Sequence, residues 1–218
     1  GDVVIDGGQL NAPGGRIEIG AVSDIGEVTF SVGEDTLIFQ DNVQKGNVAV
    51  INSSLVNTIS GEGGDIAINA RNLTVSNFSQ ISSGIDFGLG TETSQAGNIE
   101  IDVIETVLLL DGSTIANGVI GLGAGGNVTV SAENISILNG SQIGTAGLGS
   151  SDIGDVTLKV LDTIVFSGRN PTNNNPSGIL ASVASLLGFV GQGNGGNINL
   201  SAQKVILSDA ATIASAVI

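Results

Sequence analysis

Carboxylates are the side chains in this sequence best suited to catalysis. The chain has 21 acidic and 6 basic residues and no His, Cys, Met, Trp or Tyr. Without His or Cys there is no His-based triad, Cys nucleophile, or thiolate or imidazole metal site. A glycosidase or lyase needs two carboxylates about 5–9.5 Å apart, and Glu100 and Asp102 are the most suggestive pair. With no base or cationic cluster beside them, we expect a solvated strand face and a chain that is not an enzyme.

A row of Asp and Asn residues raises the separate question of cation binding. Carboxylate and amide oxygens are calcium ligands, but the nonapeptide calcium-binding repeat does not recur here. We interpret the row as a stacked ladder in which Asn and Asp satisfy the backbone of a turn. No metal or other cofactor is therefore expected. The row comprises Asp65, Asn98, Asn127, Asp155 and Asn197.

Composition limits the partners and the location of the chain. A formal charge of −15 with few, scattered basic residues argues against a nucleic-acid surface. The longest apolar run, residues 179–190, is 12 residues long, too short for a membrane-spanning segment. The chain opens without a signal-peptide pattern and begins and ends within strand-like sequence. We expect it to be a piece of a longer protein.

An internal repeat predicts the elements that hold these residues. Alternate residues after each of five glycines are Ile, Val or Leu, which is typical of a strand with one apolar face. Two further apolar segments follow in each repeat, and such units bury their apolar faces by stacking. Because parallel crossovers are right-handed, we predict an all-β, right-handed parallel β-helix with three short strands per coil. The anchors are Gly64, Gly97, Gly126, Gly154 and Gly196.

The chain divides into an irregular and a regular part. Residues 63–218 contain the five clear repeats, and those anchored at Gly97 and Gly154 are one residue longer at the corner after their first strand. Residues 1–62 are predicted to form atypical first coils. Their alternating segments at 16–19, 27–30 and 47–50 suggest about three more coils. Roughly eight coils would make a rod of about 40 Å.

Residues 168–195 are predicted to form a long loop in which residues 177–179 resume the third strand and residues 180–190 make an apolar excursion before the next anchor. This loop is the candidate binding site. Loops on a rigid scaffold commonly carry binding residues, and a flap over the flank of the β-helix is the alternative interpretation. A second, acidic loop at residues 84–96 contains Asp86, Phe87 and Glu92. The candidate binding residues in the long loop are Arg169, Asn170, Leu180, Leu186, Leu187 and Phe189.

Several motifs resemble one family of secreted proteins. The runs at 126–130 and 196–200, each leading to a strand and then Ser/Ala-x-Ile, are similar to filamentous-haemagglutinin-type exoproteins of two-partner secretion, especially large cyanobacterial members. Residues 6–20 resemble the end of that family's N-terminal secretion domain, where it passes into the repeats. Residues 175–180, followed by 191–198, resemble the family's longer repeat. The resemblance covers essentially the whole chain.

This resemblance implies a role that the residues alone do not. It implies a β-helical shaft that is secreted or displayed on the bacterial cell surface and exported by an outer-membrane transporter partner. It also implies adhesion to a host-cell, surface or glycan receptor, or a role in surface layers. Because most of the secretion domain is missing, transporter recognition is not assigned to residues of this chain.

Three functions follow, and we expect the first: a non-enzymatic structural or adhesive shaft segment. A carbohydrate-active β-helix resembling pectate lyase would need Asp, Lys and Arg clustered on one strand face, with calcium. An ice-binding solenoid would need a regular outward Thr array, but Glu100 and Asn199 interrupt the position of Thr129 and Thr157. Open ends of the β-helix would offer strand edges for pairing, so we expect the isolated chain to self-associate.

Overall fold

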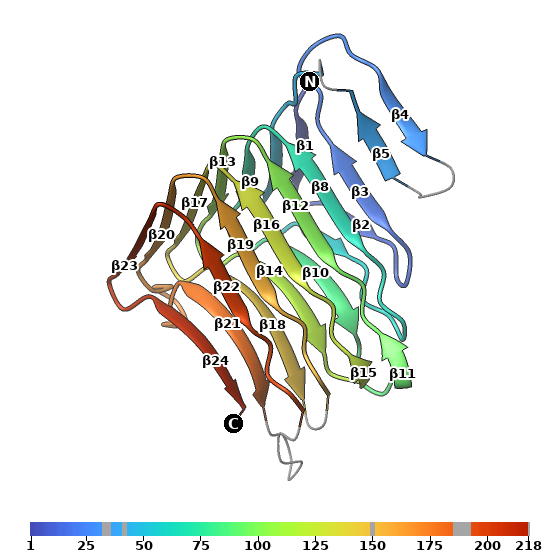
Figure 1. Cartoon of the computed structure of the whole chain (residues 1–218), viewed down its shortest axis with the longest axis vertical. Helices are drawn as coiled ribbons and strands as arrows, with labels where there is room; N and C mark the ends of the chain where they lie inside the picture. Colours follow the sequence, from blue (N-terminus) through green and yellow to red (C-terminus); the bar gives the residue numbers. More distant parts are fainter. Residues whose placement is uncertain (32–35, 41–42, 149–150, 185–192, 218) are drawn as a thin grey trace.

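Three long parallel sheets wrap the chain into a solenoid (Figure 1). The structure is a computed structural model that describes residues 1–31, 36–40, 43–148, 151–184 and 193–217. Within these ranges the regular elements are all strands. Each complete coil contributes one strand to each sheet, and the strands of successive coils pair in parallel. The predicted all-β parallel β-helix with three strands per coil is confirmed.

Along one coil, the chain passes through sheet I, then sheet II, then sheet III. Sheet I contains β3 (Ile17–Gly20), β8 (Ile66–Ala70), β12 (Ile99–Val103), β16 (Val128–Ala132), β19 (Val156–Val160) and β22 (Ile198–Ser201). Sheet II contains β1 (Val3–Asp6), β6 (Val48–Ile51), β9 (Leu73–Val75), β13 (Thr106–Leu109), β17 (Asn134–Leu138), β20 (Thr163–Ser167) and β23 (Lys204–Ser208). Sheet III contains β2 (Gln9–Asn11), β7 (Leu55–Asn57), β10 (Gln80–Ile85), β14 (Thr114–Val119), β18 (Gln142–Leu148), β21 (Gly178–Ala184) and β24 (Thr212–Val217).

The predicted number of coils is too high at the N-terminal end. Residues 1–62 form one complete coil (β3, β6 and β7) and the partial coil β1–β2, so the described chain has six complete coils. Segments 16–19 and 47–50 supply two faces of one coil, and segment 27–30 belongs mainly to β4 (Val28–Ser31), which pairs antiparallel with β5 (Thr36–Phe39). Alternation marks a strand with one apolar face but does not identify its pairing partner.

Two small sheets stand outside the three long ones. The hairpin β4–β5 interrupts the first complete coil and lies at the upper right of Figure 1. Strands β11 (Gly90–Gln95) and β15 (Leu122–Ala124) pair in parallel at the corner between sheets III and I. We call this corner the third corner; the first joins sheets I and II, and the second joins sheets II and III.

Ladders of aliphatic side chains fill the interior. Residues two positions after the anchor glycines are in register from coil to coil, as the repeat predicts. The same stacking holds for the inward positions of the other two sheets. In the last coil, Val205 and Leu207 are 42% and 47% exposed, whereas Ile164 and Phe166, their neighbours in register, are fully buried. One further coil would be needed to cover them.

The anchor glycines bring the backbones of successive coils into direct contact. A Cβ on Gly97 would overlap the backbone of Gly64, and one on Gly126 or Gly154 would overlap the carbonyl of the preceding anchor. The series starts at Gly15, whose carbonyl occupies the space beside Gly64. Gly196 meets Gly154 in the same way. Any other residue at these positions would push two coils apart.

We predict that Gly126→Ala destabilises the solenoid by about 1–3 kcal/mol, the typical cost of overpacking a tight interior. The matched control is Gly118→Ala, because no heavy atom lies within 4 Å of a Cβ built on Gly118. Urea unfolding followed by circular dichroism measures both. The midpoint should fall for Gly126→Ala and stay level or rise slightly for the control, since Ala loses less backbone entropy than Gly. Equal losses in both variants would contradict this explanation.

Candidate functional site

The structure divides the candidate loop of residues 168–195: the third strand resumes within residues 177–179, as predicted, but it extends to Ala184, so the assignment of residues 180–184 to an excursion is wrong. Residues 178–184 form β21, a core strand of sheet III, in which Ile179, Ala181 and Val183 are fully buried. Leu180 therefore lies on the outward side of this strand, paired with Gly144 and Ala214. Small Ala and Ser residues between the apolar ones hid the alternation of this strand. The predicted residues Leu186, Leu187 and Phe189 lie outside the described residues.

The remaining part of the loop is a compact turn at the second corner. Arg169 bridges to Pro176, and its Nη1 donates to the carbonyl of Asn174 at 2.8 Å. Asn170 is 1% exposed, and its Oδ1 accepts hydrogen bonds from the backbone N–H groups of Thr172 and Asn173 at 2.8 and 3.2 Å. This side chain therefore organises the turn from inside. Of the two predicted residues, only Arg169 is exposed to a ligand.

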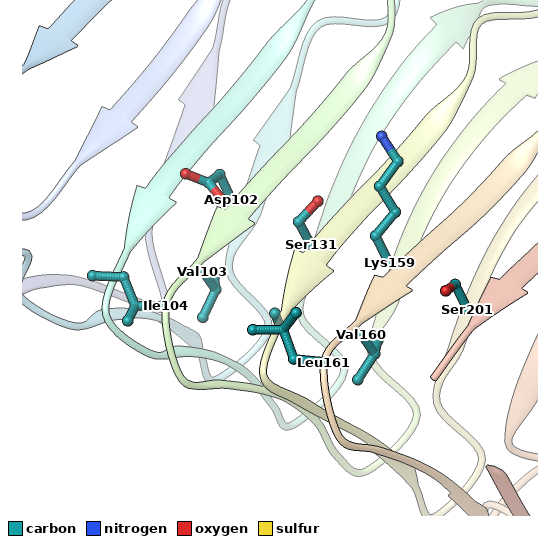
Figure 2. A pocket seen from close by; sticks show the side chains of 9 residues that line it. Asp102, Val103, Ile104, Ser131, Lys159, Val160, Leu161 and Ser201 are labelled. Atoms are coloured by element: carbon teal, nitrogen blue, oxygen red, sulfur yellow. The ribbon is translucent and has the colours of Figure 1, made fainter. Parts of the chain in front are cut away.

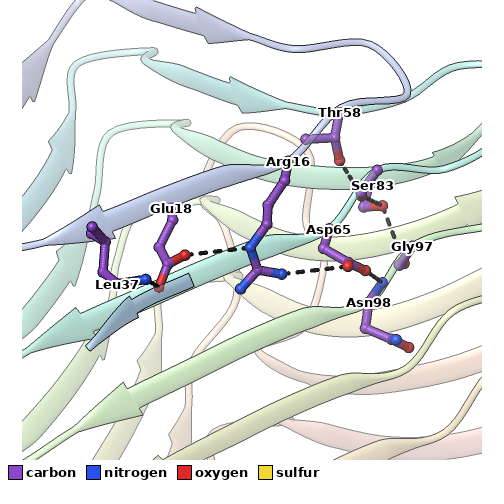
Figure 3. Close-up of polar contacts among 9 residues, drawn as sticks. Arg16, Glu18, Leu37, Thr58, Asp65, Ser83, Gly97 and Asn98 are labelled. Carbon is purple, nitrogen blue, oxygen red and sulfur yellow. Dashed lines mark hydrogen bonds and ion pairs between the residues drawn. The ribbon is translucent and has the colours of Figure 1, made fainter. Parts of the chain in front are cut away.

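The row of Asp and Asn residues is a hydrogen-bonded ladder at the third corner. Each side-chain oxygen accepts the backbone N–H of the equivalent residue one coil later, over distances of 2.7–2.8 Å. Arg16 occupies the position before Asp65, and its Nη1 lies 3.4 Å from Asp65 Oδ2 (Figure 3). The structural interpretation of the row is confirmed. Its acceptors are Asp65, Asn98, Asn127 and Asp155, and its last donor is Asn197.

A second polar ladder, which the repeat pattern did not predict, lies inside the solenoid. Side chains on the inner face of sheet III reach across to the carbonyls of the anchor glycines: Ser83 Oγ donates to Gly64 O at 2.8 Å, and Thr145 Oγ1 donates to Gly154 O at 2.8 Å (Figure 3 shows Ser83). Ser215 repeats the contact with Gly196 in the last coil. The sequence does carry a signal for this ladder: each of these polar residues stands two positions after an inward Ile and therefore faces the interior.

Asn117 makes the most complete contact of this inner ladder. Its Nδ2 donates to Gly97 O at 2.6 Å, and its Oδ1 accepts the N–H of Gly126 at 3.1 Å. The side chain is 1% exposed, so water does not replace these bonds. It therefore links two successive anchor glycines to sheet III. The glycine corner is held by this bond as well as by close packing.

We predict that Asn117→Ala destabilises the solenoid by about 1–3 kcal/mol, because it leaves a buried N–H without a partner. Asn117→Ser should recover part of the loss, since Ser83 holds the same position one coil earlier. Asn199→Ala is the control, because Asn199 is exposed on sheet I. Urea midpoints for the three variants check the order. If the control lost as much stability as Asn117→Ala, the inner ladder would not be the cause.

An open hollow of about 440 Å³ lies on the outer surface (Figure 2). It lies where the outer face of sheet I meets the first corner. The polar residues Asp102, Ser131, Lys159 and Ser201 come from four successive coils of one outward row. Ile104 and Leu161 stand at the corner and are 53% and 73% exposed. The hollow therefore combines an apolar side with a polar side.

Asp102, one member of the carboxylate pair that we considered for catalysis, lines this hollow. Both Glu100 and Asp102 face outward from β12, as predicted. Lys45 reaches across from the segment before β6, and its Nζ lies 2.8 Å from Asp102 Oδ2 and 3.4 Å from Asn69 Oδ1. Asp102 therefore serves as the partner of a lysine. Among the described residues, no group of three or more His, Cys, Asp and Glu could hold a metal ion.

The same lysine secures the inserted hairpin against sheet I. Lys45 Nζ lies 5.8 Å from the centre of the Phe39 ring, and this ring fills the space beside Gly20. Glu18 Oε1 accepts the N–H of Leu37 at 2.9 Å (Figure 3). The Lys45 side chain is 13% exposed and Asp102 is 61% exposed. Among the described residues, the hairpin and the segment after it contact sheet I through the Phe39 ring, the Leu37–Glu18 hydrogen bond and the Lys45–Asp102 ion pair.

We predict that Lys45→Ala loosens the hairpin without unfolding the solenoid. An ion pair with one exposed partner contributes about 0.2–1 kcal/mol, so the effect should be local. Hydrogen exchange of the amides of β4 and β5 should accelerate severalfold, while exchange in β12 and β16 stays unchanged. Lys204→Ala is the control, because Lys204 is exposed at the far end of sheet II. Unchanged exchange in the hairpin would mean that the lysine does not hold it.

Two exposed carboxyl groups near the ends have lowered pKa values. Hydrogen bonds from the backbone and side chain of Asn47 lower the pKa of Asp2, and hydroxyls of Ser167 and Ser208 lower the pKa of Asp209. A carboxyl whose pKa is lower when folded stabilises the fold at neutral pH, and this contribution is lost as the pH falls through its folded pKa. Both effects concern the corners and not the hollow.

Comparisons with family models, curated proteins and solved structures found no match to this chain. The described residues contain no helix with the length and apolar character needed to cross a membrane.

The register of sheet I places Glu100, Thr129, Thr157 and Asn199 in one outward row, so the Thr array is interrupted as expected.

Proposed function

We propose that this chain is a non-enzymatic structural and adhesive shaft segment of a secreted protein on the bacterial cell surface. The observation that supports it best is the use of the polar residues. The recurring Asp, Asn, Ser and Thr side chains of the corners bond to the backbone of the next coil or of the opposite sheet. Such bonds make a stiff rod and leave few groups for chemistry.

The outer surface supports binding better than catalysis. The hollow has one carboxylate already paired with Lys45 and one lysine, Lys159, without an ion pair in the described part of the chain. General acid–base or electrostatic catalysis would need convergent titratable groups or donors. The exposed Ile104 and Leu161 instead offer apolar contact to a ligand.

The cellular role of the shaft follows from the resemblance of the repeats to filamentous-haemagglutinin-type exoproteins. On that basis an outer-membrane transporter exports the full protein, and its receptor is a host-cell, surface or glycan structure. The glycine anchors and Ser-x-Ile corners that carry the resemblance are the positions where coils touch. Ser79, Ser113 and Ser141, for example, are fully buried. Ser113 Oγ accepts the backbone N–H of Ser79, and Ser141 Oγ accepts the backbone N–H of Ser113.

We predict binding without turnover when the purified chain meets polysaccharides. Glycan arrays and intact cells measure binding, and the release of reducing ends or unsaturated products from pectate, with and without calcium, measures turnover. The variant Ile104→Ser/Leu161→Ser removes the apolar side of the hollow, and Phe30→Ser is the control on the hairpin. Binding lost only in the hollow variant supports an adhesive face. Product release would overturn the proposal, and the absence of binding would contradict its adhesive part and leave a spacer.

A further inference from the structure

Two features on opposite edges of sheet I complement each other in shape, and one offers a lysine where the other carries a carboxylate. One is a notch at the first corner, formed by Ile104 and Leu161, and the other is a knob at the third corner, centred on Phe87. We propose that a second copy of this chain inserts Phe87 into the notch and places Asp86 beside Lys159. The shafts would then associate side by side. This inference does not depend on the proposed adhesive function.

The notch arises from alternating corner lengths. Between sheets I and II, the coils of β12 and β19 have an extra residue, and the coil of β16 between them has the shorter corner. Ile104 and Leu161 belong to the two longer corners and stand out from them (Figure 2). Ala132 of the shorter corner is 4% exposed and lies on the floor of the hollow. Two coil spacings of about 4.8 Å separate the longer corners, enough room for an aromatic ring.

The knob is an exposed aromatic residue on an ordered support. Phe87 is 77% exposed, and Leu89 and Leu122 beside it are 46% and 53% exposed. Asp86 Oδ1 accepts the N–H of Phe87 at 2.7 Å, and Asp86 O accepts the N–H of Leu89 at 3.1 Å. Leu122 N donates to Leu89 O at 3.0 Å and joins the turn to the next coil. These bonds fix the backbone of the turn in advance, which lowers the entropy cost of burying the ring.

Charge supports the same pairing. The sequence has no Lys or Arg between Arg71 and Lys159, so Lys159 is the nearest cation available to an acidic knob in the central coils. Asp102 is engaged by Lys45, which leaves Lys159 as the cation of the hollow that has no ion pair in the described ranges. Three exposed carboxylates at this corner, Glu105 and Asp162 on the longer corners and Glu133 on the shorter corner between them, oppose an incoming carboxylate. Glu133 is the central one of the three. Removing its charge should strengthen the contact.

The positions of knob and notch set the geometry of the assembly. They lie at the two ends of the sheet I strands, and the turn at Phe87 leads into β12 while the notch is centred on β16. The contact is therefore heterologous, because each copy uses two different surfaces. Repeating it adds copies in an open row instead of closing a dimer. The net charge of −15 opposes crowding of copies, so the association should need salt that screens distant charges.

Sedimentation equilibrium of the whole chain in about 0.15 M salt, where the screening length is about 8 Å, tests the proposal. We expect concentration-dependent growth beyond dimers, weakened about tenfold or more by Phe87→Ser and by Leu161→Ser. Phe30→Ser is the control, because Phe30 is 58% exposed on the hairpin away from both features. Leu207→Lys is measured in parallel, because it disturbs contact through the open end and leaves knob and notch intact.

Charge reversal makes the test specific for the pairing. Asp86→Lys and Lys159→Asp should each weaken association, and the double variant should restore it to within about threefold of the original chain. Glu133→Gln should strengthen it. A monomer at every concentration would overturn the proposal. So would growth that Leu207→Lys abolishes and the knob and notch variants leave unchanged, because the contact would then run through the ends.

Discussion

Close approach of one coil's backbone to the next at the third corner is the constraint on which the rest of the structure depends. The anchor glycines have no side chain at the point where a Cβ would overlap the preceding coil. This contact keeps the start of sheet I at the spacing of hydrogen-bonded strands. The apolar ladders, the corner ladders and the placement of outward residues all follow from this spacing. A side chain at one anchor would disturb two coils, because each anchor both receives and makes the contact.

Polar side chains in this solenoid act mainly on the backbone. The glycine corner leaves carbonyl groups in a dry interior, where an unpaired group is costly. Asn117, Ser83 and Thr145 of sheet III satisfy them. On the outside, the Asp65–Asn197 ladder does the same for N–H groups. The two ladders enclose the glycine corner from its inner and outer sides, which explains why Asn, Ser and Thr recur at fixed places in the repeats.

Individual surface features arise where the repeat is irregular. An extra residue in alternate first corners exposes Ile104 and Leu161, and an insertion in the first complete coil places a hairpin over sheet I. A longer third corner presents Phe87. Each change leaves the inward ladders in register, because it falls at a corner between strands. A rod of this kind can vary its surface for binding and association while its interior stays the same.

The sequence by itself determined the fold class, the three strands of each regular coil and the role of the Asp and Asn row. These properties depend on local alternation and on the recurrence of glycine at equivalent positions of the repeat, and both patterns can be read directly from the sequence. Tertiary structure alone decided that segments 16–19 and 47–50 share one coil, that segment 27–30 enters a hairpin, and that Leu180 belongs to a core strand. It also decided that Asp102 meets Lys45 and that Asn170 is buried. Pairing partners and burial depend on which distant segments stack, and an alternating pattern is the same whichever partner a strand meets.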